Sequence, residues 1–133
     1  MNQQQATVDR DFTVSLFSFG YKHGLPEADL VWDVRFLPNP YWISELKDRS
    51  GLEKDVAAYA LDNETAREFF TLLEPLLLFL VHRHAGGKRS RLRIGIGCTG
   101  GRHRSVAVVE CLKKFLDGSG CNLNVFHRDI EKR

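Results

Sequence analysis

The stretch Leu92-Arg93-Ile94-Gly95-Ile96-Gly97-Cys98-Thr99-Gly100-Gly101-Arg102-His103-Arg104-Ser105 decides the fold. Apolar residues alternate with others from Leu92 to Cys98 and predict a strand, because successive side chains of a strand point to opposite faces. Gly100 and Gly101 then predict a tight loop. After it, apolar residues recur every three or four positions and predict a helix that ends before Gly118. A strand, a glycine-rich loop and a helix in this order indicate one unit of an α/β fold.

Further elements on both sides of this unit extend the alternation. We expect strands at Phe12–Phe19, Leu30–Val34 and Asn122–His127. Asp33, inside the second of these strands, could orient Arg35 or Arg104, or could cap the loop that follows. Strands that alternate with helices predict a single α/β domain with a small, mostly parallel sheet flanked by helices.

A long helix is expected before the central strand. Asp62 or Asn63 can cap its start, and the pattern runs to about His84. Pro75 lies inside this pattern and should kink the helix or divide it into two. Because the segment is apolar over much of its circumference after Phe69, we expect it to be well buried.

Length and composition limit the classes of protein that fit. The 133 residues suffice for one domain with a core, and we interpret residues 12–133 as that domain and residues 1–11 as a disordered tail. The longest apolar run, Leu76–Val81, is about a third of a membrane span, and the amino terminus lacks the features of a signal peptide. Three cysteines, an odd number without a CxxC pair, favour the reducing cytoplasm.

Charge is divided unevenly along the chain. Residues 1–81 carry seven basic and thirteen acidic side chains, whereas residues 82–133 carry twelve basic and four acidic ones. The second part is therefore strongly basic within a protein whose formal net charge is only +2. Such an asymmetry predicts an anionic partner for the second part.

The loop between the central strand and its helix has the composition of an anion site. A glycine-rich turn at a helix amino terminus directs unpaired backbone N–H groups outward, and the helix dipole adds partial positive charge. Thr99 and Ser105 add hydroxyl groups, and Arg102 and Arg104 add full charges. We interpret the loop as a site for phosphate or another oxyanion. A glycine turn that only allows close packing, with its arginines in solvent, is the alternative.

The same loop has the spacing of a cysteine-dependent phosphatase. Cys98 and Arg104 match the C-x5-R-S/T pattern, in which a thiolate attacks phosphorus while the arginine binds the oxygens. Those enzymes usually have His before the cysteine, where this chain has Gly97. They also need a general acid, for which Asp55 and Asp62 are the candidates. A buried thiol that ends the strand is the favoured interpretation of Cys98.

Five blocks of sequence occur in order along nearly the whole chain. They are Ser18-Phe19-Gly20-Tyr21-Lys22-His23-Gly24, Asp33-Val34-Arg35-Phe36-Leu37-Pro38-Asn39-Pro40, Gly51-Leu52, Gly97 to Val106, and His127-Arg128-Asp129. This set closely resembles the C-terminal domain of the RapZ/YvcJ family of bacterial proteins, over about residues 12–133. One departure is Tyr41, where the family often has His.

The resemblance implies a function. In that family the domain follows a P-loop nucleotide-binding domain, which is missing here because the chain contains no G-x4-G-K-[S/T] motif. The sequence thus looks like a free-standing or excised C-terminal domain. RapZ-type members are RNA-binding adaptors that present small regulatory RNAs to an endoribonuclease and sense glucosamine 6-phosphate through this domain. A phosphosugar, RNA, a ribonuclease and a separate P-loop domain are accordingly the expected partners.

Two sets of residues follow as candidates. The anion or phosphosugar site is expected to contain Lys22, Arg35, Asn39, Cys98, Thr99, Gly100, Gly101, Arg102, His103, Arg104 and Ser105. The RNA-binding set comprises Arg83, Lys88, Arg89, Arg91, Arg128, Lys132 and Arg133. A solvated loop that only keeps the protein in solution is the alternative for residues 82–93, where no aromatic residue is available for base stacking.

The remaining expectations concern cofactors, aromatic residues and assembly. No histidine or cysteine pair has the spacing of a structural zinc site, so neither a metal nor a cofactor is expected. Trp32 and Trp42 are expected in the core or in the wall of a pocket. Because one small domain offers little area to RNA, a homo-oligomer is favoured.

Overall fold

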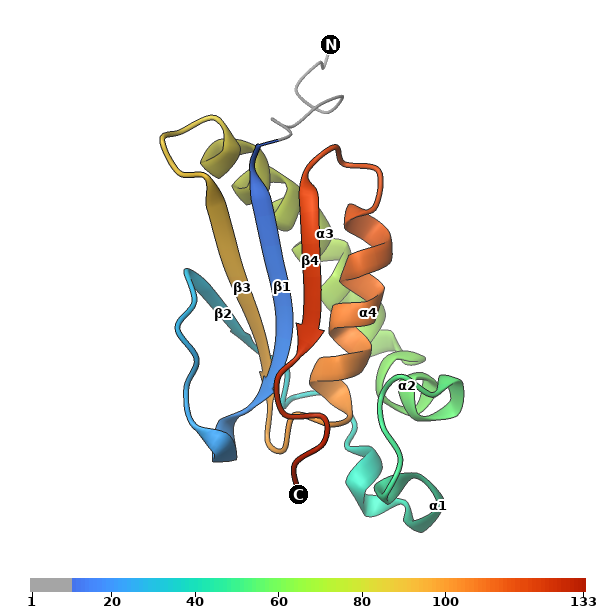
Figure 1. Ribbon diagram of the computed structural model, residues 1–133. Helices are drawn as coiled ribbons and strands as arrows, with labels where there is room; N and C mark the ends of the chain where they lie inside the picture. The colour runs from blue at the N-terminus through green and yellow to red at the C-terminus, as the bar shows by residue number, and fades with distance from the viewer. Residues whose placement is uncertain (1–10) are drawn as a thin grey trace.

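Four strands lie side by side in one parallel sheet with the order β2-β3-β1-β4 (Figure 1). The computed structural model describes residues 11–133, and the strands there are β1 (Thr13–Gly20), β2 (Leu30–Asp33), β3 (Arg91–Cys98) and β4 (Asn122–His127). Each lies within about one residue of its expected position. The tail expected at residues 1–11 falls, apart from Asp11, outside the described residues.

Two long helices cover one face of this sheet (Figure 1). These helices are α3 (Glu64–Ala85) and α4 (Arg104–Leu116). Leu16 of β1 and Ile94 of β3 form the core with Leu77 and Leu112, and all four side chains are fully buried. The α/β fold with a small parallel sheet flanked by helices is therefore confirmed.

The other face of the sheet explains two glycines in the central strand. The rings of Phe17, Phe19 and Tyr21 lie over β3, and a Cβ atom on Gly97 would come within 2.5 Å of the Phe19 ring. Gly95 is similarly close to Phe17. Glycine weakens a strand, and here its missing side chain makes room for aromatic rings of the same domain.

Helix α3 differs from the expectation in two ways. It begins at the predicted cap, where the Asn63 side chain accepts a hydrogen bond from the Ala66 N–H at 2.9 Å, and it runs without division through Pro75. Its burial was predicted wrongly, because Leu72 is 70% exposed and Phe79 is 59% exposed. A four-stranded sheet offers room for only one stripe of the helix, which consists of Ala66, Leu73, Leu77 and Val81.

Two short helices between β2 and α3 were missed by the sequence analysis. They are α1 (Ser44–Lys47) and α2 (Lys54–Leu61), and they follow the 3-10 turn η3 (Pro40–Trp42). Neither has a side-chain cap, and four to eight residues are too few for a stable isolated helix. Packing stabilises them, since Val56 and Ala60 of α2 are fully buried. In residues 11–133, no helix is long and apolar enough to cross a bilayer.

Candidate functional site

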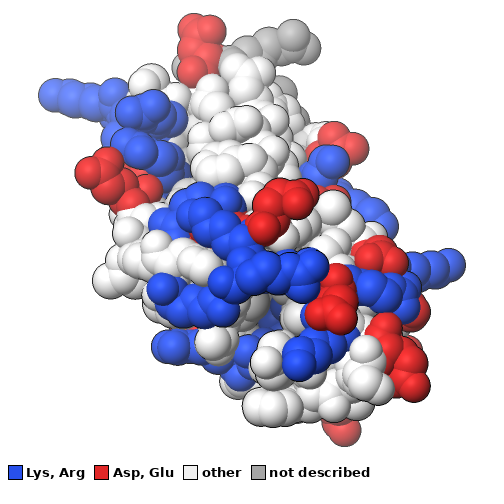
Figure 2. Space-filling model, turned by 60° about the horizontal axis from the view of Figure 1, so that its bottom comes forward, with Lys and Arg blue, Asp and Glu red and all other residues white. Residues whose placement is uncertain are grey.

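A cavity of about 550 Å³ opens beside the carboxyl ends of β1 and β3. In parallel sheets this is the edge where ligands usually bind, because the loops that follow the strands converge there. Figure 2 looks toward this end and shows Lys and Arg side chains gathered across its middle. The cavity is lined by Lys22, Asn39, Tyr41, Trp42, Lys47, Asp48, Cys98, Thr99, Gly100, Arg102, His103, Arg104, Lys132 and Arg133.

The loop from Thr99 to His103 forms one wall. Gly101 has a φ of +78°, which is costly for residues with a side chain, and a Cβ atom there would lie 2.5 Å from the Gly20 nitrogen. The Lys22 N–H also donates to the Thr99 carbonyl at 3.1 Å. The two glycines thus allow the end of β1 to pack directly on the loop. Lys22 is held beside the loop as a result.

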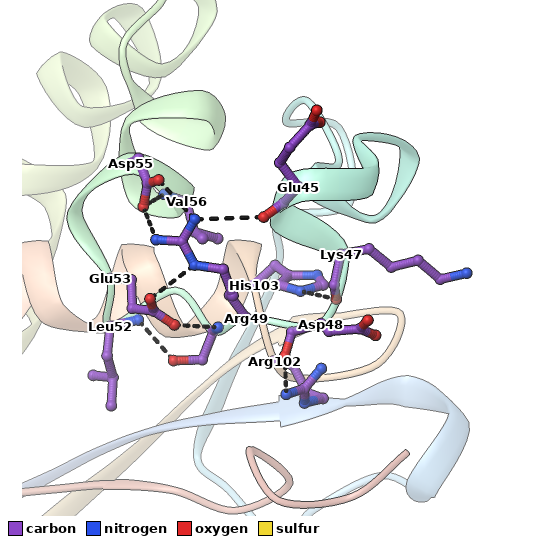
Figure 3. A network of polar contacts seen from close by, with 11 residues as sticks. Glu45, Lys47, Asp48, Arg49, Leu52, Glu53, Asp55, Val56, Arg102 and His103 are labelled. Atoms are coloured by element: carbon purple, nitrogen blue, oxygen red, sulfur yellow. Dashed lines mark hydrogen bonds and ion pairs between the residues drawn. The ribbon is translucent and has the colours of Figure 1, made fainter.

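A second wall comes from the segment around α1, which a polar network fastens to the loop (Figure 3). The Gly51 N–H donates to the Arg102 carbonyl at 2.8 Å, and His103 Nε2–H donates to the Lys47 carbonyl at 3.0 Å. Arg49 stiffens the segment by binding both Glu53 and Asp55. Burial lowers the pKa of His103 below its usual 6.5, so this imidazole is neutral at pH 7.

The cations of the cavity differ in how firmly they are already engaged. Lys22 is exposed, and its ammonium has no ion pair within residues 11–133. Arg102 donates from Nε to the Ile130 carbonyl at 2.9 Å and from Nη2 to the Asp48 carbonyl at 3.3 Å. Lys132 and Arg133 have carboxylate partners at 2.7 and 3.3 Å. Lys22 is therefore the cation with the greatest freedom to reach a ligand.

Arg104 lies in the cavity wall but is turned mainly toward the backbone. Its Nη1 donates to the carbonyls of Arg35 at 2.6 Å and Leu37 at 3.3 Å, and its Nη2 to Thr99 Oγ1 at 3.4 Å. Nε is buried and has no hydrogen-bond partner among the described residues. Burial lowers the pKa of this guanidinium, which nevertheless stays charged because arginine starts from a very high value. Arg104 fastens the loop after β2 to the cavity.

Cys98 combines burial with a place in the cavity wall. It is 2% exposed, and its thiol donates to the Ser105 hydroxyl oxygen at 3.1 Å. The general-acid candidates do not line this cavity. Asp55 is paired with Arg49, whose hydrogen bonds lower the carboxyl pKa, and Asp62 is paired with Arg67 at 3.2 Å.

A buried carboxylate supports the site from behind. Asp129 is fully buried, accepts a hydrogen bond from the Gly20 N–H at 2.7 Å, and binds Arg128 at 2.8 Å and Lys132 at 2.7 Å. These hydrogen bonds outweigh the opposing effect of burial and lower its pKa to about 2. The sequence analysis noted the block His127-Arg128-Asp129 but assigned no role to its carboxylate. Asp129 joins the carboxyl-terminal segment to the end of β1.

The structure brings together most of the expected anion site. Those that line the cavity are Lys22, Asn39, Cys98, Thr99, Gly100, Arg102, His103 and Arg104. Gly101 and Ser105 lie behind that surface and are buried. Arg35 is outside the lining set: its guanidinium lies over the Tyr21 ring and is bound by Asp33, the residue expected to orient it. The sequence analysis missed Lys47 and Asp48, because α1 itself was not foreseen.

The RNA-binding candidates fall at two opposite ends of the molecule. Arg83, Lys88, Arg89 and Arg91 surround the loop before β3, at the amino end of the sheet (Figure 1). Lys132 and Arg133 line the cavity at the other end, and Arg128 binds Asp129 and the Gly24 carbonyl. For residues 11–133, no cluster of three histidine, cysteine or acidic side chains could hold a metal ion.

Comparison with known proteins identifies the family. The model described as the RapZ C-terminal domain matches residues 12–131. A nucleotide-binding protein of Geotalea daltonii is 53% identical over 124 residues, which are 92% of this chain and 44% of the relative. A nucleotide-binding protein of Caldicellulosiruptor saccharolyticus is 48% identical over 120 residues, 90% of this chain and 41% of the relative. The chain spans less than half the length of these relatives. It belongs to the family of the RapZ C-terminal domain.

Proposed function

We propose that this domain is a regulatory module that binds a phosphorylated small metabolite in the cavity at the carboxyl end of the sheet. The cavity carries this proposal, because six cationic side chains line it and Asp48 is the one carboxylate among its lining residues. Its volume of about 550 Å³ falls within the roughly 300–1,000 Å³ typical of small-molecule sites. Family membership suggests glucosamine 6-phosphate as the metabolite to test first.

The details of the wall fit an oxyanion. Helix α4 begins at Arg104, so the positive end of its dipole lies at the cavity. Lys22 has an unpaired ammonium, and the buried Nε of Arg104 would gain an acceptor from a bound phosphate. His103 is neutral and committed to a backbone carbonyl, so it supports the wall and adds no charge.

RNA binding is the second part of the proposal. Lys132 and Arg133 lie on the rim of the same cavity, so RNA at this end would share the cations that attract the metabolite. Binding of the metabolite would then weaken RNA binding, which is the behaviour of a metabolite-sensing adaptor. Family membership and the basic carboxyl end support this role.

Titration calorimetry with glucosamine 6-phosphate and with inorganic phosphate tests the metabolite site. We expect Lys22→Ala to weaken the binding of both compounds about tenfold, because one charge-assisted contact is lost. Lys88→Ala is the matched control: it removes an exposed lysine from the opposite end and should leave both affinities unchanged. Equal effects of the two substitutions, or no binding of either compound to the native chain, would exclude the site.

A cysteine-dependent phosphatase is the alternative, and one observation favours it. Cys98 lies in the cavity wall with the Ser105 hydroxyl 3.1 Å from its sulfur, the contact that the C-x5-R-S sequence would use to stabilise a thiolate. Against it, neither Asp55 nor Asp62 reaches the cavity. Hydrolysis of an aryl phosphate that disappears in Cys98→Ser would establish the enzyme. Unchanged metabolite binding in Cys98→Ser, without any hydrolysis by the native chain, would support the binding module.

A further inference from the structure

Trp42 is a large aromatic side chain left open to solvent in the wall of a cationic cavity. We infer that its indole ring is the platform on which the sugar ring of a phosphorylated ligand stacks, so that the site prefers a sugar phosphate to inorganic phosphate. The inference rests on the proposed phosphate site and adds a second point of contact to it. Trp42 is thereby a specificity-determining residue.

The exposure of Trp42 is the first observation. Its side chain is 76% exposed although it lines the cavity, whereas the other tryptophan, Trp32, is partly buried against the core. Exposed indole area carries a free-energy cost in water, and covering it with a ligand would be favourable. Pockets for small molecules typically combine such aromatic walls with a few polar groups that orient the ligand.

The position of Trp42 is fixed before any ligand arrives. It ends the turn η3, where the Asn39 side chain accepts from the Tyr41 N–H at 3.1 Å and the Asn39 carbonyl accepts from the Trp42 N–H at 3.2 Å. Pro40 is buried beneath the turn, and the Tyr41 ring stands edge-on to Trp42 with 5.2 Å between the centroids. An aromatic side chain has only two side-chain torsions, so stacking on it loses little conformational entropy.

The groups beside Trp42 suit a hydroxyl-bearing ring. The Lys47 ammonium lies 4.6 Å from the centre of the Tyr41 ring, and the Asp48 carboxylate is exposed at the same wall. One can donate to sugar hydroxyls and the other can accept from them, while the apolar face of the sugar covers Trp42. Nucleobases in closed pockets are stacked between two apolar or aromatic side chains. Because Tyr41 stands edge-on to Trp42, these two rings do not form such a sandwich, and the geometry favours a sugar.

Calorimetry with three probes separates the contribution of Trp42 from that of the phosphate site. The probes are inorganic phosphate, glucosamine 6-phosphate and adenosine 5′-monophosphate. We expect Trp42→Ala to weaken sugar phosphate binding about tenfold and to leave inorganic phosphate within about twofold, since stacking is worth roughly 1–2 kcal/mol. Trp42→Phe should recover most of the loss. Phe79→Ala, which removes an exposed aromatic ring of α3 outside the cavity, should change neither affinity.

Tryptophan emission gives an independent readout. In a Trp32→Phe variant, Trp42 is the only tryptophan of the chain. Saturating glucosamine 6-phosphate should then shift the emission to shorter wavelength as the ring is covered, and saturating phosphate should not. An unchanged spectrum at saturation would overturn the inference.

The outcomes distinguish this inference from the proposed function. If Trp42→Ala binds the sugar phosphate as well as the native chain does, while Lys22→Ala is weakened, the stacking role fails and the phosphate site remains. If phosphate does not bind the native chain, the proposed function fails first. Tighter binding of the adenosine probe than of the sugar phosphate, lost in Trp42→Ala, would reject the sugar ring as the stacked group.

Discussion

The two ends of the parallel sheet carry similar numbers of cations in very different settings. At the carboxyl end, loops from distant parts of the chain enclose a cavity, and Arg102, Arg104 and Lys132 are each held by hydrogen bonds or ion pairs. At the amino end, Lys88 and Arg91 are exposed on a short loop, outside the cavity. The difference teaches that basic composition attracts an anion, whereas only fixed geometry selects one.

The largest expected effect tests the anchoring of the carboxyl end. Asp129→Ala should lower the free energy of unfolding by about 3–5 kcal/mol, because it leaves the charges of Arg128 and Lys132 without their buried partner. Chemical denaturation measures this change. Asp48→Ala, which removes an exposed carboxylate paired with Arg133, should cost less than about 1 kcal/mol. Similar losses in the two variants would mean that burial of Asp129 contributes nothing.

The same carboxylate predicts acid sensitivity. The pKa of Asp129 is about 2 in the folded protein, below its ordinary 3.8, so the unfolded chain takes up a proton first as the pH falls. Its contribution to stability is complete above about pH 4 and is lost progressively toward pH 2. Denaturation midpoints recorded across this interval should fall less steeply for Asp129→Asn than for the native chain.

A substitution in the glycine loop has the next largest effect. Gly101→Ala should destabilise the protein by about 3 kcal/mol, because Gly101 has a positive φ and a Cβ atom there would press on the backbone of β1. Gly100→Ala is the control in the same loop, where an added Cβ meets nothing within 4 Å. At the amino end, Gly87→Ala makes only an ordinary 3.5 Å contact. Thermal melts that rank Gly100 or Gly87 with Gly101 would contradict the contrast between the ends.

RNA binding gives a smaller effect that compares the two ends directly. Replacing both Lys132 and Arg133 by Ala should flatten the dependence of log affinity on log salt by about 1.4, since each phosphate contact with a single strand contributes about 0.7. Replacing Lys88 and Arg89 together is the matched control. Filter binding at several salt concentrations decides between them: a larger change in the second variant would move the RNA surface to the amino end.

The smallest effect concerns His103. Burial lowers its pKa below 6.5, so the unfolded chain binds a proton more readily, and stability should decrease as the pH falls below about 6.5. Gln can still donate to the Lys47 carbonyl without titrating, so His103→Gln should remove this part of the pH dependence. Urea denaturation at pH 7.5 and pH 5.5 measures it, and an equal drop in both proteins would show that other groups are responsible.

Much of the fold could be predicted because its signals are local. Strand alternation around Leu92–Cys98, the Asn63 cap and the glycine loop each depend on a few neighbouring residues. The burial of α3 was predicted wrongly, since periodicity alone does not reveal how wide a surface the sheet offers to Leu72 or Phe79. Helices α1 and α2 were missed because packing, more than their own sequence, stabilises them.

The candidate site divides in the same way. The residue types around Cys98–Ser105 indicated an anion site from the sequence, and eight of the eleven expected residues line one cavity. Arg35 is engaged by Asp33 and lies outside the lining set, although nothing in its local sequence distinguishes it from Lys22. Lys47 and Asp48 entered the cavity wall through a segment whose structure was not foreseen.

The sequence by itself determined the parallel α/β fold, the family and the loop that meets an anion, because these follow from short patterns and from blocks of residues in order. Tertiary structure alone decided that Arg104 donates mainly to the backbone, that Asp129 is buried behind the site, and that Trp42 faces the cavity. The physical reason is that a side chain's partners come from segments far apart in the chain. Charge and exposure at the cavity are settled only where those segments meet.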